Sequence, residues 1–466
     1  MSLYDKILDN LPEVVKPQEK LTFNKKLIWT LLILVIFFAL QLIPLYGLGQ
    51  NTLQTFELLS ILFGSEFGSL ISLGIGPLVT ASIVLQLLNG SGIVKFNLQS
   101  PEGKAKFHGT QKLLSIFFIL FEAAIYVFFG GLAPAPELAG TSAYLILQIV
   151  LIAQIFLGGI VIMMMDDVVM KWGFGSGISL FIAAGVSKSV FVRALSWLPS
   201  PNNPEISTGA LPALFQSLTA GDPTTAMLMF SAIVATIVVF CVAVYTQAMK
   251  VELPLSFGRV RGYGIRWPLN FMYTSNIPVI LVAALFANIQ LFARLLQNIG
   301  FPILGTFVGN TPATGLISMI SGQNIVGSII RQGSFLIGWK PYLSALVYVL
   351  LMMIGVVIFA LLWVQTSGTD ARSQAKQIIN SGLQIPGFRK DERILEAILK
   401  RYITPLTVMG ALAVGFLAAL ADLAGALTNG TGLLLTVGII YKMYEDIARQ
   451  HMMDMNPAMR KFMGGE

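Results

Sequence analysis

Long apolar runs separated by short polar segments dominate the chain. Ten of these runs are long enough to cross a bilayer as helices, which takes about 20 mostly apolar residues because backbone polar groups must be paired inside the membrane. The runs lie near 27–45, 74–90, 112–131, 144–165, 174–195, 225–248, 271–295, 341–364, 402–421 and 431–448. The pattern predicts an all-α polytopic membrane protein with ten transmembrane helices.

The composition supports this prediction and removes several alternatives. Charged residues make up 11% of the 466 positions, whereas a soluble domain carries about 25%, so the chain lacks the polar surface that soluble domains need. The 55% of hydrophobic residues excludes a disordered chain. A single cysteine, Cys241, and two histidines, His108 and His451, argue against a disulfide, a histidine-built metal site and a serine–histidine hydrolase. We therefore expect no metal and no cofactor.

Lysine and arginine are distributed unevenly between the two ends of the predicted helices. When successive runs alternate in direction, 25 of the 30 basic residues fall on the side of the termini. The other five lie at or beyond the opposite ends, and they are Lys188, Arg193, Arg294, Arg331 and Lys340. Because cytoplasmic segments of membrane proteins are enriched in lysine and arginine, both termini are predicted to be cytoplasmic.

Two shorter apolar segments do not fit a plain bundle. Residues 2–11 place their leucine and isoleucine side chains on one helical face, which predicts a helix on the membrane surface, with a frayed tail as the alternative. Residues 52–73 contain an apolar piece of about a dozen residues on the external side, too short to span. We expect either a short helix that dips into a central cavity or a helix at the interface.

Glycine-rich helix starts recur with a shift of five spans. GSGISL at 175–180 returns as GTGLLL at 430–435, and GIGPLV at 74–79 has a counterpart in SNIPVI at 275–280. A shift of five spans reverses the direction through the membrane, which indicates an inverted-topology repeat of spans 1–5 against 6–10, with chance similarity as the alternative. The predicted division is a cytoplasmic amphipathic segment at 1–26, a first half at 27–195, an external linker at 196–224, a second half at 225–448 and a cytoplasmic tail at 449–466.

Two long cytoplasmic connections, 249–270 and 365–401, are basic and place charges beside glycines in turn-like positions. These charges are Arg259, Arg261, Arg389 and Lys390. Charges that project from a rigid base suit docking onto an acidic surface or an RNA backbone, although the positive-inside rule alone also produces basic loops. In the second connection, Asp370 and Asp391 are each expected to cap a short helix.

The repeated segments carry bulky apolar side chains on helices that are otherwise rich in small residues. They are Ile75, Val79, Phe174, Ile178, Ile277 and Leu435. A ring of such side chains between two halves forms a hydrophobic constriction, which blocks ions by dewetting and can still deform. Core packing is the alternative for each of them.

Glu122 is the exceptional charge, because it lies in the middle of the third run. An intramembrane carboxylate is costly and indicates a function. Thr80 on the second run and Asn288 on the seventh lie at comparable depths, and no second ionisable group accompanies them, so a polar latch between helices is favoured over a proton relay. Asp166 and Asp167, at the cytoplasmic end of the fourth run, are expected to mark only a helix boundary.

Together these motifs resemble the SecY family, the large subunits of protein-conducting channels, and its archaeal type most. The resemblance covers essentially the whole chain. It is carried, in order, by LPEVVKP, LGIGPLVTASIVLQLLNGSGI, QKLLSI, GFGSGISLFIAAGV, VELPLSFGRVRG, SNIPVILVAALFANIQ, GFRK, RYITPLTVM and NGTGLLLTVGIIYKMYE. Long matches in the right order and spacing are highly specific.

The resemblance implies roles for these residues. The six apolar residues would form a pore ring, in which Phe174 departs from the usual aliphatic side chain and makes the ring tighter or asymmetric. A lateral gate would open between spans 2–3 and 7–8, with Thr80, Glu122 and Asn288 as its polar cluster. A plug around residues 55–67 would close the external funnel. The plug residues are Thr55, Phe56, Leu59, Ile61, Leu62, Phe63 and Phe67.

The resemblance also implies partners and a function. Arg259, Arg261, Arg389 and Lys390 would contact the ribosome and its RNA. A SecE-type small subunit would clamp the two halves, and a small third subunit of the archaeal type would sit at the periphery. The channel would move nascent polypeptides with signal sequences across the cytoplasmic membrane, and would release apolar segments sideways into lipid, without catalysing a reaction.

Two other classes of protein remain as alternatives from the residues alone. A secondary transporter built on inverted repeats predicts coupling-ion ligands at the midplane, where the sequence offers only Glu122. An intramembrane enzyme needs a serine–histidine, paired-aspartate or metal constellation within the spans, which the sequence does not offer. Ribosome co-sedimentation favours a channel, and solute uptake by vesicles favours a transporter.

Overall fold

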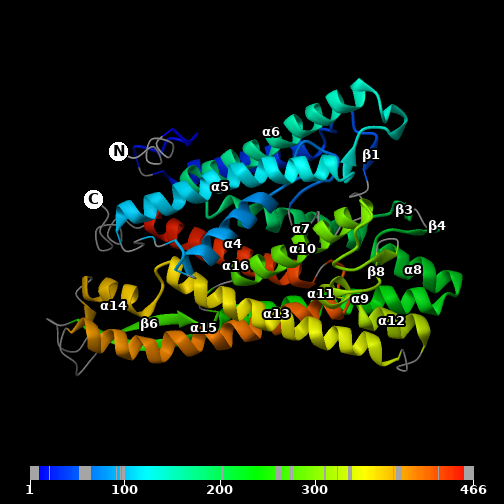
Figure 1. The fold of residues 1–466 in the computed structure, drawn as a ribbon. Coiled ribbons are helices and arrows are strands. Elements are labelled where there is room, and N and C mark those ends of the chain that lie inside the picture. Colours follow the sequence, from blue (N-terminus) through cyan, green and yellow to red (C-terminus); the bar gives the residue numbers. More distant parts are fainter. Residues whose placement is uncertain are drawn as a thin grey trace.

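The chain folds into a bundle of helices in the computed structural model (Figure 1). The structure describes residues 10–19, 21–51, 64–90, 92–94, 96, 100–200, 203–257, 264–272, 274, 277–308, 311–322, 324–333, 338–380, 383–384, 391–428 and 430–455. Within this part of the chain, ten long helices occupy the positions of the ten apolar runs. They are α2 (Phe23–Gln41), α4 (Gly76–Gly90), α5 (Pro101–Phe128), α6 (Ser142–Trp172), α7 (Gly177–Leu195), α9 (Pro223–Ala248), α10 (Ile277–Asn298), α13 (Trp339–Thr366), α15 (Glu392–Leu423) and α16 (Gly430–Met455).

Among the described helices, eight are long and apolar enough to cross a membrane, and α4 and α16 are the two of the ten that are not among them. Helix α4 has only 15 residues, and α16 carries charged residues from Lys442 onward. Both pack against several other helices, α4 against α5, α10 and α13, and α16 against α7, α9 and α15. Helices that pack mainly against protein need not satisfy the length and polarity that lipid imposes.

Helix boundaries differ from the predicted ones at several places, and three of the differences follow from capping or proline. Helix α5 begins at Pro101 rather than near 112, since Ser100 accepts a hydrogen bond from the Gly103 amide at 3.1 Å. Helix α2 ends at Gln41 rather than near 45, shortly before Pro44. Asp391 accepts a hydrogen bond from the Arg393 amide at 2.9 Å and caps α15, which continues without a break to Leu423. The prediction of a separate short helix after Asp391 is therefore wrong.

A three-stranded sheet in the basic connections is the main element that the sequence analysis did not predict. Strand β5 (Lys250–Phe257) pairs with β6 (Gly264–Asn270) on one side and with β9 (Leu383–Gln384) on the other. Next to the sheet, α14 (Ala371–Asn380) packs on the start of α15, and Asp370 caps α14 as expected. A separate small apolar core holds these elements together. It contains Leu269, Val364, Ala375, Ile378, Leu395, Leu399, Ile403 and Leu406.

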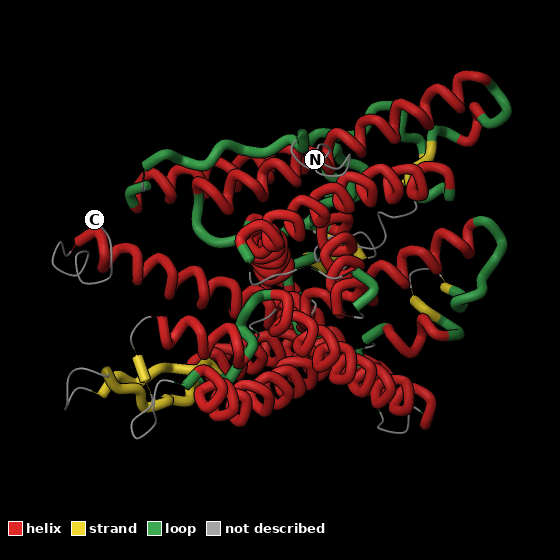
Figure 2. Tube along the Cα trace, turned by 60° about the vertical axis from the view of Figure 1, so that its left-hand side comes forward, coloured by secondary structure: helices red, strands yellow, loops and turns green. Residues whose placement is uncertain are grey.

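The elements at the two ends of the bundle differ. The sheet, α14 and the end of α16 lie at one end, which Figure 2 shows from a second side. At the other end lie β1 (Gln50–Asn51) with β2 (Leu132–Ala133), and β3 (Pro199–Ser200) with β4 (Asn203–Ser207). The remaining short elements are η1 (Pro136–Leu138), α8 (Ala210–Ala220), β7 (Phe307–Val308), β8 (Thr311–Pro312), α11 (Leu316–Ile320) and α12 (Ile325–Gln332). The basic connections are therefore on the side where the sequence places the cytoplasm.

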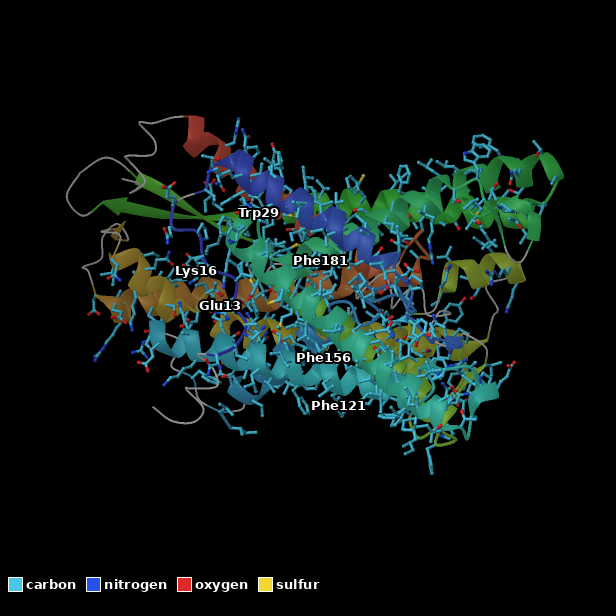
Figure 3. The ribbon with its side chains drawn as sticks, turned by 90° about the horizontal axis from the view of Figure 1, so that it is seen from above. Glu13, Lys16, Trp29, Phe121, Phe156 and Phe181 are labelled. Atoms are coloured by element: carbon cyan, nitrogen blue, oxygen red, sulfur yellow. The ribbon has the colours of Figure 1, made fainter. Side chains whose placement is uncertain are left out.

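The large core lies between the helices of both halves. Phe181 on α7 is completely buried and stacks on Phe37 of α2 with ring centroids 4.7 Å apart. Figure 3 shows Phe181 within the bundle, whereas Trp29 on α2 and Phe121 on α5 lie nearer its outer surface, where both are exposed. Apolar side chains on the outer surface are what a lipid environment favours.

Candidate pore and gate site

Glu122, Thr80 and Asn288 form one hydrogen-bonded chain inside the bundle. The Thr80 hydroxyl on α4 lies 3.1 Å from Glu122 Oε1 on α5. Asn288 on α10 donates from Nδ2 to the same hydroxyl oxygen at 2.8 Å. Glu122 and Asn288 are buried, and Thr80 is partly buried. The three polar residues that the sequence placed at comparable depths are therefore in direct contact.

The hydrogen bonding of this cluster is incomplete. Thr80 also lies 2.9 Å from the Gly76 carbonyl oxygen, so its single hydroxyl proton is shared between that oxygen and Glu122. Among the described residues, Glu122 Oε2 has no hydrogen-bond partner although it is buried. A buried polar group that is partly satisfied stabilises its surroundings less than a complete network does. The polar contact between α4 and α10 is thus part of a network that is only partly satisfied.

The six apolar residues that the sequence singled out lie at or near the starts of four helices, α4, α7, α10 and α16. Ile75, Val79 and Leu435 are almost fully buried, and Ile178 and Ile277 pack against the same core from partly buried positions. Helix α4 contacts α10, α10 contacts α16, and α16 contacts α7. The structure therefore brings five of the six residues into one apolar core that is shared by both halves.

Phe174 packs differently from the other five. Its buried ring lies 5.5 Å from the ring of Phe23, and the Lys26 ammonium group lies 5.8 Å from its centroid. Its amide donates to the Thr30 hydroxyl at 3.1 Å. The larger aromatic side chain is thus accommodated against the first turns of α2, where a cation over its face is favourable. Its role in a ring stays a prediction.

Most of the predicted plug, residues Thr55, Phe56, Leu59, Ile61, Leu62 and Phe63, lies outside the described residues. The described segment that follows, from Gly64 to the start of α4, is held tightly. Phe67 is buried against Tyr126 of α5, and its carbonyl oxygen accepts from the Asn51 amide group at 2.8 Å. Backbone hydrogen bonds also join this segment to the chain after α2. The Leu45 amide donates to the Gly68 carbonyl oxygen, and the Leu70 amide donates to the Ile43 carbonyl oxygen.

The four basic residues Arg259, Arg261, Arg389 and Lys390 also lie outside the described residues. Their flanking strands are described, and they adjoin. Ser256 of β5 pairs with Gln384 of β9 in antiparallel orientation, so segments 258–263 and 385–390 follow two strands of one sheet that run in opposite directions. Sequence patterns did not reveal this relation, because the two strands lie more than a hundred residues apart and β9 has only two residues.

Asp422 is partly buried and belongs to a hydrogen-bonded network that the sequence analysis missed. Near the end of α15, it accepts from the Tyr348 hydroxyl of α13 at 2.6 Å and from the Thr431 amide of α16 at 2.9 Å. The signal that could have found it is its place directly after the ninth run, which matches that of Asp166 directly after the fourth. Among the described residues, no group of three or more histidine, cysteine, aspartate or glutamate side chains is placed to hold a metal ion.

Comparison with known proteins gives a consistent result along the sequence. The SecY family model matches residues 69–444. The protein translocase subunit SecY of Methanothermobacter thermautotrophicus is 43% identical over 99% of this chain and 98% of its own length. These matches include every helix from α4 to the middle of α16.

Solved structures share the fold over nearly the same extent. A structure described as that of a protein-conducting channel superimposes with a TM-score of 0.83 at 41% identity, and the match covers 98% of this chain and 99% of that one. Sec61 in the canine ribosome–channel complex from the endoplasmic reticulum superimposes with a TM-score of 0.79 at 41% identity, with the same coverage. The chain is similar to these channel proteins in both sequence and fold.

Proposed function

The chain belongs to the SecY family of protein translocase subunits, and on this premise we propose how its residues perform the work of a protein-conducting channel. It is a multi-pass protein of the cytoplasmic membrane and a channel subunit, not an enzyme. Secretory polypeptides cross the membrane between its two halves, and apolar segments leave sideways into lipid. Membership of this family decides against the transporter and intramembrane-enzyme alternatives.

The observation that carries the proposal is the hydrogen-bonded chain of Glu122, Thr80 and Asn288. Glu122 and Thr80 belong to the proposed first half at 27–195, and Asn288 belongs to the second at 225–448. The bond from Asn288 to Thr80 therefore crosses the boundary along which a lateral gate would open. A polar latch at this boundary keeps the gate closed until a sufficiently apolar segment competes with it.

The expected energies agree with this role. Hydrogen bonds between membrane helices average about 0.6 kcal/mol and reach about 1.7 kcal/mol. Full burial of one leucine side chain in an apolar environment contributes about 1.5–3 kcal/mol. One or two additional leucines in a passing segment thus offset the latch, so the gate discriminates between segments by their hydrophobicity.

The ring and the plug close the channel along its axis. Ile75, Val79, Ile178, Ile277 and Leu435 would form a constriction that excludes ions by dewetting, with Phe174 as its aromatic sixth member. Residues 55–67 would form the plug on the external side. The hydrogen bonds of residues 67–70 to the segment after α2 support a fixed base for that plug.

Partners supply the driving force. The channel acts with a SecE-type small subunit and a small third subunit, and with the ribosome and its nascent chain. We assign the ribosome contact to Arg259, Arg261, Arg389 and Lys390, because their segments follow two paired strands, β5 and β9, of the sheet in the basic connections. Two basic segments that follow strands of one sheet offer more contacts to ribosomal RNA phosphates than either does alone.

A reversible lock of the latch tests the proposal. Thr80→Cys and Asn288→Cys are combined in a Cys241→Ser background and joined with a short, cleavable bifunctional thiol reagent. We expect the cross-link to block membrane insertion of signal sequences, and cleavage to restore it, because α4 and α10 can no longer separate. The matched control joins Lys112→Cys to Asp167→Cys, which replace an ion pair between α5 and α6 within one half. Insertion that continues through a fully cross-linked Thr80–Asn288 pair contradicts the gate.

A further inference from the structure

The start of α7 is capped by an aspartate from the preceding helix rather than by its own first residues. Asp166 lies on α6, is buried, and accepts a hydrogen bond from the Ile178 amide at 2.9 Å. Ser176, which directly precedes α7, makes no side-chain hydrogen bond to the helix. Because the first amides of a helix have no partner within it, Asp166 supplies the acceptor that this helix start requires.

The start of α16 is capped in the same way. Asp422 lies on α15 and accepts from the Thr431 amide at 2.9 Å and also from the Thr431 hydroxyl. Thr431 is the second residue of α16, as Ile178 is of α7. A carboxylate at a helix N-terminus is favourable for both the amides and the helix dipole.

Glycine permits the close approach at both junctions. A Cβ on Gly177 would lie 2.6 Å from Asp166 Cα, and a Cβ on Gly430 would lie 2.1 Å from the Ala421 carbonyl carbon. Both glycines are the first residues of their helices. Counted from helix starts, Gly430 thus corresponds to Gly177. The sequence motifs GSGISL and GTGLLL pair Gly430 with Gly175 instead, so the two alignments differ by two residues.

Helices α6 and α15 also pack closely against the segments that lead into α4 and α10. A Cβ on Gly158 of α6 would lie 1.8 Å from the Leu70 carbonyl oxygen, and one on Gly410 of α15 would lie 2.5 Å from that of Phe271. Leu70 and Phe271 each lie six residues before the first residue of the following helix, α4 and α10. Helices α6 and α15 therefore carry equivalent supports for all four helix starts of the proposed ring.

Resting on the proposed function, we propose that Asp166 and Asp422 are equivalent positioning residues that fix the first turns of α7 and α16 in the constriction. Asp166 holds the backbone of the ring residue Ile178 itself. Asp422 holds Thr431, which precedes the ring residue Leu435 by one helical turn on the same face. Without the cap the first turn is free to fray, so that Ile178 within the first turn of α7 and Leu435 one turn further along α16 no longer line the constriction.

Ion conductance and amide hydrogen exchange test this proposal together. The purified channel complex is reconstituted in planar bilayers, with wild type compared to Asp166→Ala, Asp166→Asn and Asp167→Ala. We expect Asp166→Ala to raise the ion leak severalfold and to accelerate exchange at the start of α7. Asp166→Asn retains an acceptor oxygen and is expected to rescue both properties. Asp167→Ala removes a neighbouring carboxylate that pairs with Lys112 instead, and is expected to leave the leak unchanged.

Ile178→Asn serves as the reference for the ring itself. If Ile178→Asn leaks and Asp166→Ala does not, the positioning role of Asp166 is overturned, whereas the proposed constriction is not. An unchanged leak in Ile178→Asn shows that the constriction lies elsewhere and overturns both. If Asp166→Ala does not assemble, Asp166→Ser replaces it as the test variant. Its shorter side chain still carries an acceptor oxygen, so we expect a smaller rise of the ion leak. A leak equal to that of wild type contradicts the proposal. Asp422→Ala and Asp422→Asn repeat the comparison for α16.

Discussion

Asn288 on α10 donates a hydrogen bond of 2.8 Å to the hydroxyl of Thr80 on α4. Thr80→Val removes this contact and keeps the shape of the side chain. We expect the closed gate to lose about 1 kcal/mol, at the middle of the range for such bonds. Less apolar signal sequences should then be inserted, which an insertion assay over a series of graded hydrophobicity measures.

Thr407→Val is the matched control for this prediction. Thr407 is buried in α15, and its hydroxyl bonds only within that helix, to the Ile403 carbonyl oxygen at 2.8 Å. The same substitution there leaves the contact between the halves intact, so the hydrophobicity threshold should stay at the wild-type value. If both variants shift the threshold equally, the effect is one of general stability and the latch is refuted.

Gly158→Ala tests the close packing of α6 against the segment before α4. The added methyl group would lie 1.8 Å from the Leu70 carbonyl oxygen, and a backbone oxygen cannot move aside as a side chain can. Overpacking of this kind costs about 1–3 kcal/mol. The melting temperature of the purified complex in detergent should fall accordingly.

The neighbouring Gly159→Ala provides the comparison. Its methyl group would meet Ile119 Cγ2 at 2.4 Å, a longer contact than the one at Gly158 and one with a side chain rather than with the backbone. We expect a smaller loss of thermal stability than in Gly158→Ala. The reverse order of the two melting temperatures would mean that Leu70 is not fixed where the structure places it.

Arg389→Glu tests the ribosome contact. Charge reversal should weaken ribosome binding most at low salt, because attraction to RNA phosphate depends on counterion release. The slope of log affinity against log salt concentration is negative, and its magnitude should decrease by roughly 0.7–0.9 for each lost phosphate contact. Co-sedimentation with ribosomes across a salt series measures both quantities.

Arg331→Glu makes the same change of charge at the opposite end of the molecule, on the exposed surface of α12. It should bind ribosomes as wild type does. Equal losses in the two variants would point to net charge rather than to a local contact.

Glu13 anchors the segment before α2 to the end of α6, and this anchor should depend on pH. Its carboxylate pairs with Lys171, whose ammonium group also donates to the Val14 carbonyl oxygen at 2.7 Å. The hydrogen bond and charge of Lys171 lower the pKa of Glu13 from 4.5. A lowered pKa means that the contact contributes fully above pH 4.5 and is lost as pH falls through the lowered value.

Limited proteolysis of residues 10–22 across this pH range reports the release. Glu13→Gln should abolish the pH dependence, and Glu19→Gln, at another exposed glutamate of the same segment, should retain it. A wild-type profile that stays flat below pH 4.5 would contradict the anchor.

Local patterns predicted the helices and the contact of the three polar residues for understandable reasons. Membrane helices follow from the requirement that every backbone group be paired, which one sequence window expresses completely. Glu122 stood out because charge is rare in such windows, and its partners Thr80 and Asn288 followed from their depth along two other runs. The structure brings all three together.

Relations between distant segments could not be predicted from such windows. The pairing of β5 with β9 depends on a strand of two residues, and the side-chain direction of Phe174 depends on where Phe23 and Lys26 lie. The role of Asp166 was underestimated for the same reason. Its place near a helix end suggested a boundary, whereas its partner is the start of the next helix, twelve residues further along the chain.

Site-specific disulfide cross-linking to a stalled translocation intermediate tests the central claim most directly, because it asks whether a polypeptide passes through the ring. In a Cys241→Ser background, single cysteines replace Ile75, Ile178, Ile277 and Leu435 in turn, and the exposed Leu145 on α6 serves as the control. We predict that all four ring positions cross-link to the same position of the nascent chain and that Leu145→Cys does not. Cross-links at Leu145→Cys without any at the four ring positions would place the polypeptide outside the constriction and contradict the account.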